Sequence, residues 1–374
     1  MTYDCIVLGI GGVGSATLLH LARRGLKVLG LDRFPVAHDR GSSHGDTRVI
    51  RLVYMEHPDY VPLVARSFEL WRELEADVGE ELYVETGLLQ VGPANGTVIP
   101  GARRSAEAHN LAVEDVSPVE ITKRFPGVRL REDQQGLYEQ RAGYLHVERC
   151  VQAHVDAARR YGAEVVTGEA VESWTASDSD VSVRTDSRSY SAAKLVVTPG
   201  AWAGDLLKDL PVEFVVRRKP LLWYRTETPQ HRLDHGMPTF FFEVDYGVFY
   251  GIPAVDHWGL KVAEHSGGEA VADPLIVDRE LRASDRDPVE RFGRDHLPGL
   301  STELTKHVVC MYTVTLDEHF VLDLHPGLPN VAFVAGLSGH GFKFTPVLGE
   351  VLADLVTDGR AGLPIDFLSC RRFA

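Results

Sequence analysis

The hydrophobic positions at the start of the chain predict a strand, a turn, a helix and a second strand. Residues 5–8 form a short apolar run of the kind that occupies a buried parallel strand. Apolar side chains then recur at helical spacing over residues 16–24, and Gly25 is a typical helix stop. A second apolar run, residues 28–31, ends on Asp32. This order of elements predicts a parallel α/β unit at the N-terminus.

The same alternation returns in the middle and near the end of the chain. An amphipathic stretch followed by glycine predicts a helix, and short apolar runs predict buried strands. These elements are a helix over 147–161 with strands over 163–167 and 194–198, then a strand over 331–336 and a helix over 346–358. Because all three parts have the same character, we expect them to build one discontinuous Rossmann-like domain.

The segments between them have alternating or aromatic strand patterns without long helices. They cover residues 82–91, 221–225, 239–250 and 259–263. Such a series predicts an antiparallel sheet. We therefore expect an α/β + β protein, with a discontinuous Rossmann-like domain (1–81, 145–212 and 305–374) and an antiparallel-sheet substrate domain inserted in two pieces (82–144 and 213–304).

Glycines fill the turn between the first predicted strand and helix. Gly9, Gly11 and Gly14 have the spacing of a dinucleotide-binding fingerprint, and Asp32 ends the next strand, where it can accept hydrogen bonds from ribose hydroxyls. A plain glycine-rich turn is the alternative. The motif does not separate NAD from FAD, but its start at residue nine is usual in large flavoproteins whose FAD spans the first domain.

Composition excludes several classes of protein. The 374 residues carry a formal net charge of −14 without basic runs, which argues against nucleic acid and anionic membranes as partners. The four cysteines are scattered, so neither a disulfide framework nor a structural zinc site is expected, and no metal ligand set is predicted. There is no apolar run long enough for a bilayer span and no pattern of a signal peptide. These features predict a cytoplasmic protein.

Several cations lie in unusual settings. Lys261 interrupts an apolar strand and Lys343 lies between two phenylalanines; the alternative to a functional role is an edge-strand or snorkelling lysine. Arg48 and Arg51 would share one face if their segment is helical, and paired guanidiniums suit a carboxylate or a phosphate. Surface salt bridges are the alternative for this pair.

Two other candidate groups have ordinary explanations when taken alone. Cys310 lies in an apolar strand pattern, which predicts a small buried hydrophobic side chain. No histidine and aspartate at a familiar spacing mark it as a protease-type nucleophile. His265, four residues after Lys261, is more often structural than catalytic in such a setting.

Taken together, these segments resemble the monomeric sarcosine oxidase and N-methyltryptophan oxidase family of FAD-dependent amine oxidases. The resemblance runs essentially end to end. Its most specific pieces are GSSHGDTRVIR at 41–51, CMYTVTLDEHF at 310–320 and GLSGHGFKF at 336–344.

The resemblance implies roles for individual residues. Cys310 matches the cysteine that carries FAD covalently through the flavin 8α-methyl, and Arg51 and Lys343 match the pair that holds the substrate carboxylate. Lys261 matches a lysine on the opposite flavin face that is important for reaction with oxygen. The other matched positions are Arg48 and His44 near the flavin, Tyr250 and His265 in the amine site, and Gly9, Gly11, Gly14, Asp32, Ser42, Thr47, Gly339 and Lys343 around FAD.

The implied activity is oxidation of the C–N bond of a secondary N-methyl amino acid, with sarcosine as the leading substrate. Sarcosine, O2 and water would give glycine, formaldehyde and H2O2. A bulkier secondary amine, such as N-methyltryptophan or a cyclic imino acid, is the alternative substrate. An NAD-dependent dehydrogenase and a flavin-bearing sensor are the alternatives outside this class. The expected partners are a small secondary amine with a carboxylate and molecular oxygen, and the chain is expected to be a monomer.

The sequence also departs from this family pattern. Ser43-His44 stands where relatives often carry two histidines, and Phe240, Phe241 and Phe242 form an aromatic run that leads to the active-site strand. We expect these positions to change the shape of the substrate pocket and therefore the preferred amine.

Overall fold

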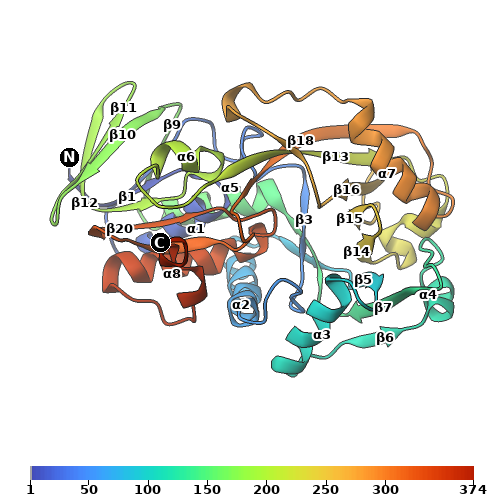
Figure 1. Ribbon diagram of the computed structural model, residues 1–374. Coiled ribbons are helices and arrows are strands. Elements are labelled where there is room, and N and C mark those ends of the chain that lie inside the picture. The colour runs from blue at the N-terminus through green and yellow to red at the C-terminus, as the bar shows by residue number, and fades with distance from the viewer. Residues whose placement is uncertain (1) are drawn as a thin grey trace.

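The computed structural model describes residues 2–374 and contains two large sheets, which lie on the left and the right of Figure 1. The first sheet has a parallel centre in which β1 lies between β12 and β2, and β9 follows β2. β20 extends it in parallel beside β12, while β10, β11 and β19 pair antiparallel. The strands are β1 (Thr2–Leu8), β2 (Val28–Asp32), β9 (Glu164–Thr167), β10 (Val171–Ala176), β11 (Val181–Thr185), β12 (Ser189–Val197), β19 (Val321–His325) and β20 (Leu328–Ala335).

Helices from distant parts of the chain cover this sheet. α1 (Gly12–Arg23) packs against both α5 (Val147–Arg160) and α8 (Thr345–Asp358), and α2 (Tyr60–Val78) packs on α5 and α8. Ten of the twelve residues of α1 are buried, because these neighbours leave it little access to solvent. Figure 1 shows the blue N-terminal and red C-terminal elements intermingled, as expected for a domain assembled from separate segments.

The second sheet has nine strands and is antiparallel except where β14 runs parallel to β5. Its order is β17-β13-β16-β15-β14-β5-β7-β6, with β18 along the other side of β13. The strands are β5 (Leu88–Pro93), β6 (Glu114–Val116), β7 (Gln134–Glu139), β13 (Val215–Tyr224), β14 (Thr239–Val244), β15 (Gly247–Ile252), β16 (Leu260–Glu264), β17 (Glu269–Ala270) and β18 (Leu304–Val314).

Smaller elements complete this half of the molecule. β3 (Thr47–Ile50), β8 (Gly143–His146) and β4 (Tyr83–Glu85) form a three-stranded antiparallel sheet. α7 (Ala283–His296) packs on the second sheet through Phe292, which stacks on Phe249 with ring centroids 4.7 Å apart. The remaining helices are α3 (Val98–Ala108), α4 (Pro118–Arg124) and α6 (Ala203–Leu206).

The expected α/β + β class is confirmed, and the predicted segments form helices and strands whose ends move by up to six residues. Two segments each hold two strands: residues 239–250 hold β14 and β15, and residues 82–91 hold β5 and β4, of which β4 belongs to the three-stranded sheet. The expectation of a purely antiparallel second sheet is wrong at β14 and β5. These strands belong to different inserted pieces, so no short hairpin has to connect them and a parallel pairing is available. β18 pairs with β13 in the second sheet, although all but its first residue follow the range 213–304 assigned to that domain. The division by residue ranges stays a prediction.

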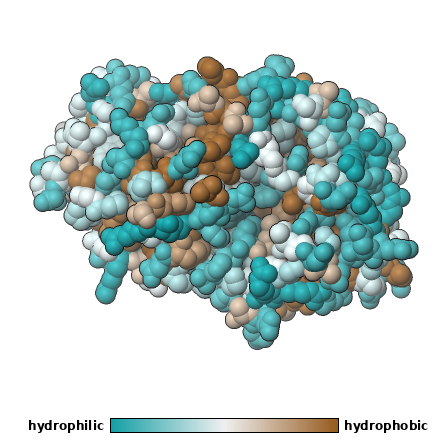
Figure 2. All heavy atoms as spheres, viewed as in Figure 1, coloured by the Kyte–Doolittle hydropathy of each residue, from teal (hydrophilic) through white to brown (hydrophobic). Residues whose placement is uncertain are grey.

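Among residues 2–374, no helix combines the length and the apolar character that crossing a membrane requires. Figure 2 shows hydrophobic side chains gathered at the top of one face, over the segment that leads from β17 to α7. In this segment Leu275 and Ile276 are 49% and 79% exposed, and Leu275 also lines the large cavity described next.

Candidate active site

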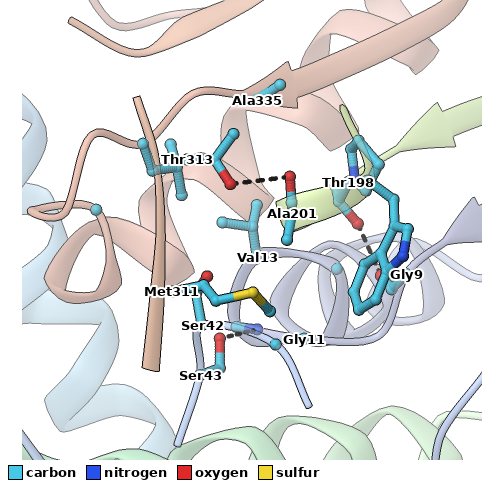
Figure 3. Close-up of a pocket in the computed structure, with 18 of the residues that line it drawn as sticks. Gly9, Gly11, Val13, Ser42, Ser43, Thr198, Ala201, Met311, Thr313 and Ala335 are labelled. Carbon is cyan, nitrogen blue, oxygen red and sulfur yellow. Dashed lines mark hydrogen bonds between the residues drawn. The ribbon is translucent and has the colours of Figure 1, made fainter. Parts of the chain in front are cut away.

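A cavity of about 700 Å³ reaches from the glycine turn after β1 to the second sheet. Figure 3 shows its first part, where Gly11 lies near Ser42 and Ser43, Gly9 lies beside Thr198, and Met311 and Thr313 of β18 approach from another side. Side chains of β14, β15 and the β20–α8 connection line the rest. The cavity is therefore large enough and long enough for a cofactor and a small substrate together.

The glycine turn has room only for glycine at two positions. A Cβ on Gly9 would lie 2.3 Å from the Thr198 carbonyl oxygen, and one on Gly14 would lie 1.8 Å from the Gly9 carbonyl oxygen. Gly11 and the start of α1 line the cavity, so backbone N–H groups and the helix dipole are placed for a diphosphate. This cradle fits the predicted dinucleotide.

Asp32 lies at the end of β2 and lines the cavity. Its carboxylate accepts hydrogen bonds from the N–H groups of Ile10 at 2.7 Å and Phe34 at 2.9 Å, which ties the glycine turn to β2. Nearby, the Trp202 ring packs against Phe34, and its indole N–H is buried with no partner among residues 2–374. A donor left free at the cavity wall is consistent with a polar ligand at this end.

Arg48 and Arg51 are not on a helix. They belong to β3 and the residue after it, and positions three apart on an extended chain point in different directions. Arg48 therefore reaches the Cys310 sulfur, whereas Arg51 forms an ion pair with Glu56 at 2.6 Å. Both line the cavity, but the segment is not helical, so the condition under which they would share one face is not met.

Cys310 lies behind the cavity wall rather than on it. Its Sγ accepts a hydrogen bond from Arg48 Nη2 at 3.0 Å. Burial raises the pKa of the Cys310 thiol, but Arg48 and His44 outweigh this effect and bring the pKa down from 9.0 to about 6. Cys310 is therefore largely a thiolate at neutral pH, and thiolates are the reactive form of cysteine. Its sulfur contacts Arg48, which lines the cavity.

Lys261 is also buried behind the wall, so the edge-strand or snorkelling alternative is wrong. Its Nζ donates to the carbonyl oxygens of Gly45 at 2.7 Å and Thr47 at 2.8 Å, and to the Thr47 hydroxyl at 3.2 Å. It also lies 5.0 Å from the centre of the Trp223 ring. Three oxygen acceptors match the three N–H bonds of an ammonium group.

Arg51 and Lys343 meet at the far end of the cavity. Both lie over the ring of Tyr54, at 4.9 and 5.3 Å from its centre. Arg51 Nε has no partner among residues 2–374, and Lys343 Nζ donates to the His340 carbonyl at 2.7 Å. Burial raises the pKa of Glu56, but Arg51 outweighs it and holds that pKa at about 2, so Glu56 stays ionised beside the pair.

Tyr250 and His265 line the cavity beside Phe241. Burial, then nearby Lys219, lowers the pKa of His265 to about 3, so this imidazole is neutral at physiological pH. Burial raises the pKa of Tyr250, whose hydroxyl is buried with no partner among the described residues. The ring centroids of Phe241 and His265 are 5.3 Å apart. These side chains make a largely apolar wall with a hydroxyl and an imidazole.

The remaining predicted residues occupy supporting positions. His44 is buried beside Cys310, and Thr47 lies against Lys261; neither lines the cavity. Ser42 lines the cavity, and its carbonyl oxygen accepts a hydrogen bond from Arg48 Nη2 at 3.1 Å. Gly339 has φ +81°, and a Cβ there would lie 2.4 Å from the Tyr312 ring, so only glycine allows this approach.

Sequence reasoning missed four residues that the structure brings to the site: Glu56, Tyr54, Tyr312 and Glu148. A carboxylate five residues after Arg51 was a signal for Glu56, because a buried guanidinium needs a counter-ion. Tyr312 lies two residues after Cys310 within the 310–320 motif, which was a signal for it. Glu148 reaches the turn beside the site only through tertiary packing.

The chain matches the family model described as FAD dependent oxidoreductase over residues 4–355. It belongs to this family, which agrees with the glycine turn and with the free polar groups at the cavity wall.

Within that family the chain belongs with the monomeric sarcosine oxidases and N-methyltryptophan oxidases. It is 39% identical to monomeric sarcosine oxidase from Bacillus sp. (strain NS-129), with coverage of 100% of this chain and 97% of that protein. It is 36% identical to N-methyl-L-tryptophan oxidase from Escherichia coli (strain K12), with full coverage of both.

Solved structures show the same fold. The open form of NikD, an unusual amino acid oxidase essential for nikkomycin biosynthesis, superposes with a TM-score of 0.85 at 26% identity, covering 98% of this chain and 97% of NikD. L-proline dehydrogenase from P. horikoshii, at 21% identity, has a TM-score of 0.84 and covers 100% and 98% of the two chains.

Proposed function

We propose that this protein is a flavin oxidase of secondary N-methyl amino acids, with sarcosine as the leading substrate. The observation that carries the proposal is the convergence of Arg51 and Lys343 over Tyr54 at one end of a cavity whose other end fits FAD. The names of the relatives, sarcosine oxidase and N-methyl-L-tryptophan oxidase, support the same substrate class. The Bacillus enzyme is the more similar of the two, which favours sarcosine.

FAD, when bound, would accept two electrons from the amine and pass them to O2. The glycine turn and the start of α1 would hold its diphosphate, and Asp32 and Trp202 would line the adenosine end. The substrate would be oxidised at its C–N bond and then hydrolysed, so that sarcosine, O2 and water give glycine, formaldehyde and H2O2.

Arg51 and Lys343 would bind the substrate carboxylate. Arg51 keeps its Nε free, and Glu56 occupies only one of its other nitrogens. Burial and Arg51 lower the pKa of Lys343, and Glu56 opposes this shift; a bound carboxylate adds a second negative charge and favours the ammonium form. Two fixed cations orient the amino acid, which leaves the amine facing Tyr250 and His265.

His265 and Tyr250 would set the protonation of the amine. A neutral imidazole and an un-ionised phenol provide no negative charge to hold an ammonium substrate. The neutral amine, which carries the lone pair needed for oxidation, is therefore favoured in this wall.

Lys261 and Arg48 would support the reaction with oxygen. Reduction of O2 produces anions, and preorganised cations stabilise such charges most where water is excluded. Both side chains are fixed by hydrogen bonds to backbone carbonyls of the 42–47 segment, so little reorganisation is needed.

Cys310 would carry FAD covalently, because its thiolate is the one low-pKa sulfur among the cysteines whose pKa shifts are resolved. We also propose the division into FAD-binding and substrate domains by the residue ranges given above, with β18 of the FAD-binding range adding a strand to the second sheet. We further propose that the protein acts as a cytoplasmic monomer.

The first experiment is peroxide release by purified protein in air, with sarcosine beside N-methyltryptophan, proline and glycine. Brisk turnover of sarcosine supports the proposal. A yellow protein that is inert with sarcosine but active with a larger amine assigns the alternative substrate, and NADH formation without peroxide overturns the oxidase.

Two variants separate the roles within the site. Lys261→Met should slow reoxidation of reduced flavin by about 100-fold, and anaerobic reduction far less; equal effects on both steps contradict the oxygen role. Replacement of Arg51 by Met should weaken binding of a carboxylate-bearing inhibitor, and unchanged affinity removes Arg51 from the substrate site.

A further inference from the structure

The turn before β3 has an unusual backbone. Gly45 and Asp46 both have positive φ, +92° and +66°. An aspartate in this region costs about 1–2 kcal/mol, so neighbouring contacts must hold it there. A turn of this kind can direct successive backbone N–H groups to the same side, where they bind an anion.

A carboxylate from the first domain occupies the N–H side of the turn. Glu148 lies in the first turn of α5, and its Oε1 accepts from Gly45 N at 2.6 Å while its Oε2 accepts from Asp46 N at 3.1 Å. The Asp46 carbonyl in return accepts from Val147 N at 2.9 Å. The start of α5 therefore holds two N–H groups of the turn through Glu148 and one carbonyl of the turn through the Val147 N–H.

Lys261 of the second sheet occupies the carbonyl side. Its ammonium donates to the carbonyls of Gly45 and Thr47 at 2.7 and 2.8 Å. One backbone segment of three residues thus links the glutamate to the lysine: the N–H groups of Gly45 and Asp46 donate to Glu148, and the carbonyls of Gly45 and Thr47 accept from Lys261. Because the peptide groups are rigid, moving one side moves the other.

We propose that Glu148 is the positioning residue for the oxygen reaction: it holds the 45–47 turn so that two carbonyls fix the Lys261 ammonium. This inference rests on the proposed role of Lys261. Glu148 touches neither the cavity nor the ammonium, so its effect is transmitted through the turn and through its negative charge.

The charges around Lys261 agree with this assignment. Burial and Arg48 lower the pKa of Lys261, whereas the negative charges of its neighbours oppose this shift. The charged and titratable groups that face Lys261 are Arg48 from β3, Asp46 from the turn, Glu148 from α5 and Cys310 from β18, with Lys306 of β18 paired to Asp46 at 2.5 Å. Loss of Glu148 removes one of two carboxylates that favour the charged ammonium.

The test uses Glu148→Gln. An amide keeps the size of the side chain but offers one acceptor in place of two, and its NH2 group opposes a backbone N–H. Flavin in the holoenzyme is reduced with dithionite and then mixed with oxygenated buffer, so the measurement needs no amine substrate. We expect reoxidation about 10-fold slower than in the native protein, with the rate of anaerobic reduction by substrate changed less than about 2-fold.

Glu80→Gln is the matched control. Glu80 pairs with Arg149 at 2.8 Å beside the same helix start, so the substitution removes an equal charge without touching the turn. Its reoxidation rate should equal that of the native protein. An equal slowing in Glu80→Gln and Glu148→Gln would assign the effect to general charge and overturn the proposal.

A double variant tests the route of the effect. If Glu148 acts through Lys261, adding Glu148→Gln to Lys261→Met causes no further slowing of reoxidation. A full additional 10-fold loss would show an independent role and overturn the proposal. If Lys261→Met alone reoxidises at the native rate, the proposed oxygen role of Lys261 is wrong. This outcome is distinguishable from a failure of the Glu148 proposal, because that variant leaves Glu148 unchanged.

The pH profile provides a signature that loss of packing would not produce. The lysine cation is present below its pKa, so reoxidation falls as pH rises through that pKa; Glu148→Gln should move this fall to lower pH. Should the Gln variant not fold, Glu148→Asp keeps the charge with a shorter reach. It should retain the native pH position of the fall while slowing the rate, and a native rate in that variant contradicts the positioning role.

Discussion

At the scale of single residues, Cys310 and Lys261 show how neighbours set the reactivity of a buried group. Both lose water, which disfavours their charged forms. Arg48 lies against the Cys310 sulfur at 3.0 Å and reverses this effect, so that the pKa of the thiol falls to about 6. At Lys261, burial lowers the pKa of the ammonium group, and the same guanidinium lowers it further. One arginine therefore favours a thiolate and disfavours an ammonium.

The low pKa of Cys310 predicts how attachment of FAD depends on pH. The thiolate is the nucleophile, so the rate of covalent attachment to apoprotein should rise as pH increases through about 6 and then level off. Arg48→Met should return the pKa toward 9.0 and slow attachment at pH 7 by up to about 100-fold. Flavin fluorescence that stays with denatured protein measures the reaction.

Two cysteine variants control this prediction. Cys310→Ser should give no covalent flavin, whereas Cys5→Ser, at a buried thiol whose pKa burial raises to about 12, should behave as the native protein. An attachment rate that does not change between pH 5 and 8 would contradict the thiolate mechanism, and covalent flavin in Cys310→Ser would show that another residue is the anchor.

Glu56 predicts a competition at Arg51. It holds one nitrogen of the guanidinium that we assign to the substrate carboxylate, and its pKa of about 2 means that pH cannot remove its charge in the working range. Glu56→Gln should therefore tighten binding of acetate by roughly 10-fold, or about 1.4 kcal/mol. Titration of the flavin absorbance measures this affinity.

The control for this variant is Glu69→Gln, because Glu69 is exposed and pairs with Arg66 on the surface of α2. Acetate affinity should be unchanged there. Weaker acetate binding in Glu56→Gln would show that Glu56 holds Arg51 in its binding position rather than competing for it.

At the scale of elements, the alternation of side chains along β14 divides its three phenylalanines. Phe240 and Phe242 face α7 and pack around Phe292 in an apolar cluster. Phe241 faces the other way, into the cavity, with its ring 5.0 Å from the Arg51 guanidinium. The expectation that the whole run shapes the pocket is therefore correct only for its middle residue.

This division predicts opposite results for neighbouring substitutions. Phe241→Ala should enlarge the amine end of the cavity and raise kcat/KM for N-methyltryptophan relative to sarcosine. Phe242→Ala should leave this ratio unchanged but lower the free energy of unfolding by about 3–5 kcal/mol. Peroxide kinetics and urea unfolding measure the two effects, and an unchanged substrate ratio in Phe241→Ala would remove Phe241 from the substrate pocket.

At the scale of the whole molecule, the cavity joins both sheets. Its walls include the glycine turn of the first sheet and the β14, β15 and β18 strands of the second. β18 also carries Cys310 and pairs with β13 along ten positions. A ligand in this cavity contacts elements of both halves, so we expect it to stabilise them together.

Removal of FAD tests this expectation. In Cys310→Ser, FAD at about 100 times its Kd should stabilise the fold by about 2.7 kcal/mol relative to the apoprotein, because it binds only the folded state. Thermal unfolding followed by circular dichroism and by tryptophan fluorescence should show one coincident transition that moves upward with FAD. Two separate transitions, with only one of them sensitive to FAD, would show that the halves unfold independently.

The sequence by itself determined the local and repetitive features of this protein. Apolar runs, helical spacing and glycine positions depend on neighbouring residues, so they identified the β1–α1–β2 unit, five of the nine strands of the second sheet (β5, β13, β14, β15 and β16) and the dinucleotide turn. Motif resemblance predicted site roles for Arg51, Lys343, Lys261 and Cys310, which stay predictions, and the spacing of Arg48 and Arg51 suggested the wrong local structure.

The tertiary structure alone decided which of these residues meet. The pairs Arg48 with Cys310, Glu148 with the 45–47 turn, and Lys343 with Tyr54 join positions 100 to nearly 300 residues apart, a separation at which periodicity carries no information. The parallel pairing of β14 with β5 has the same origin. Charge states, cavity walls and positioning contacts depend on distances in space, and only the folded chain fixes these distances.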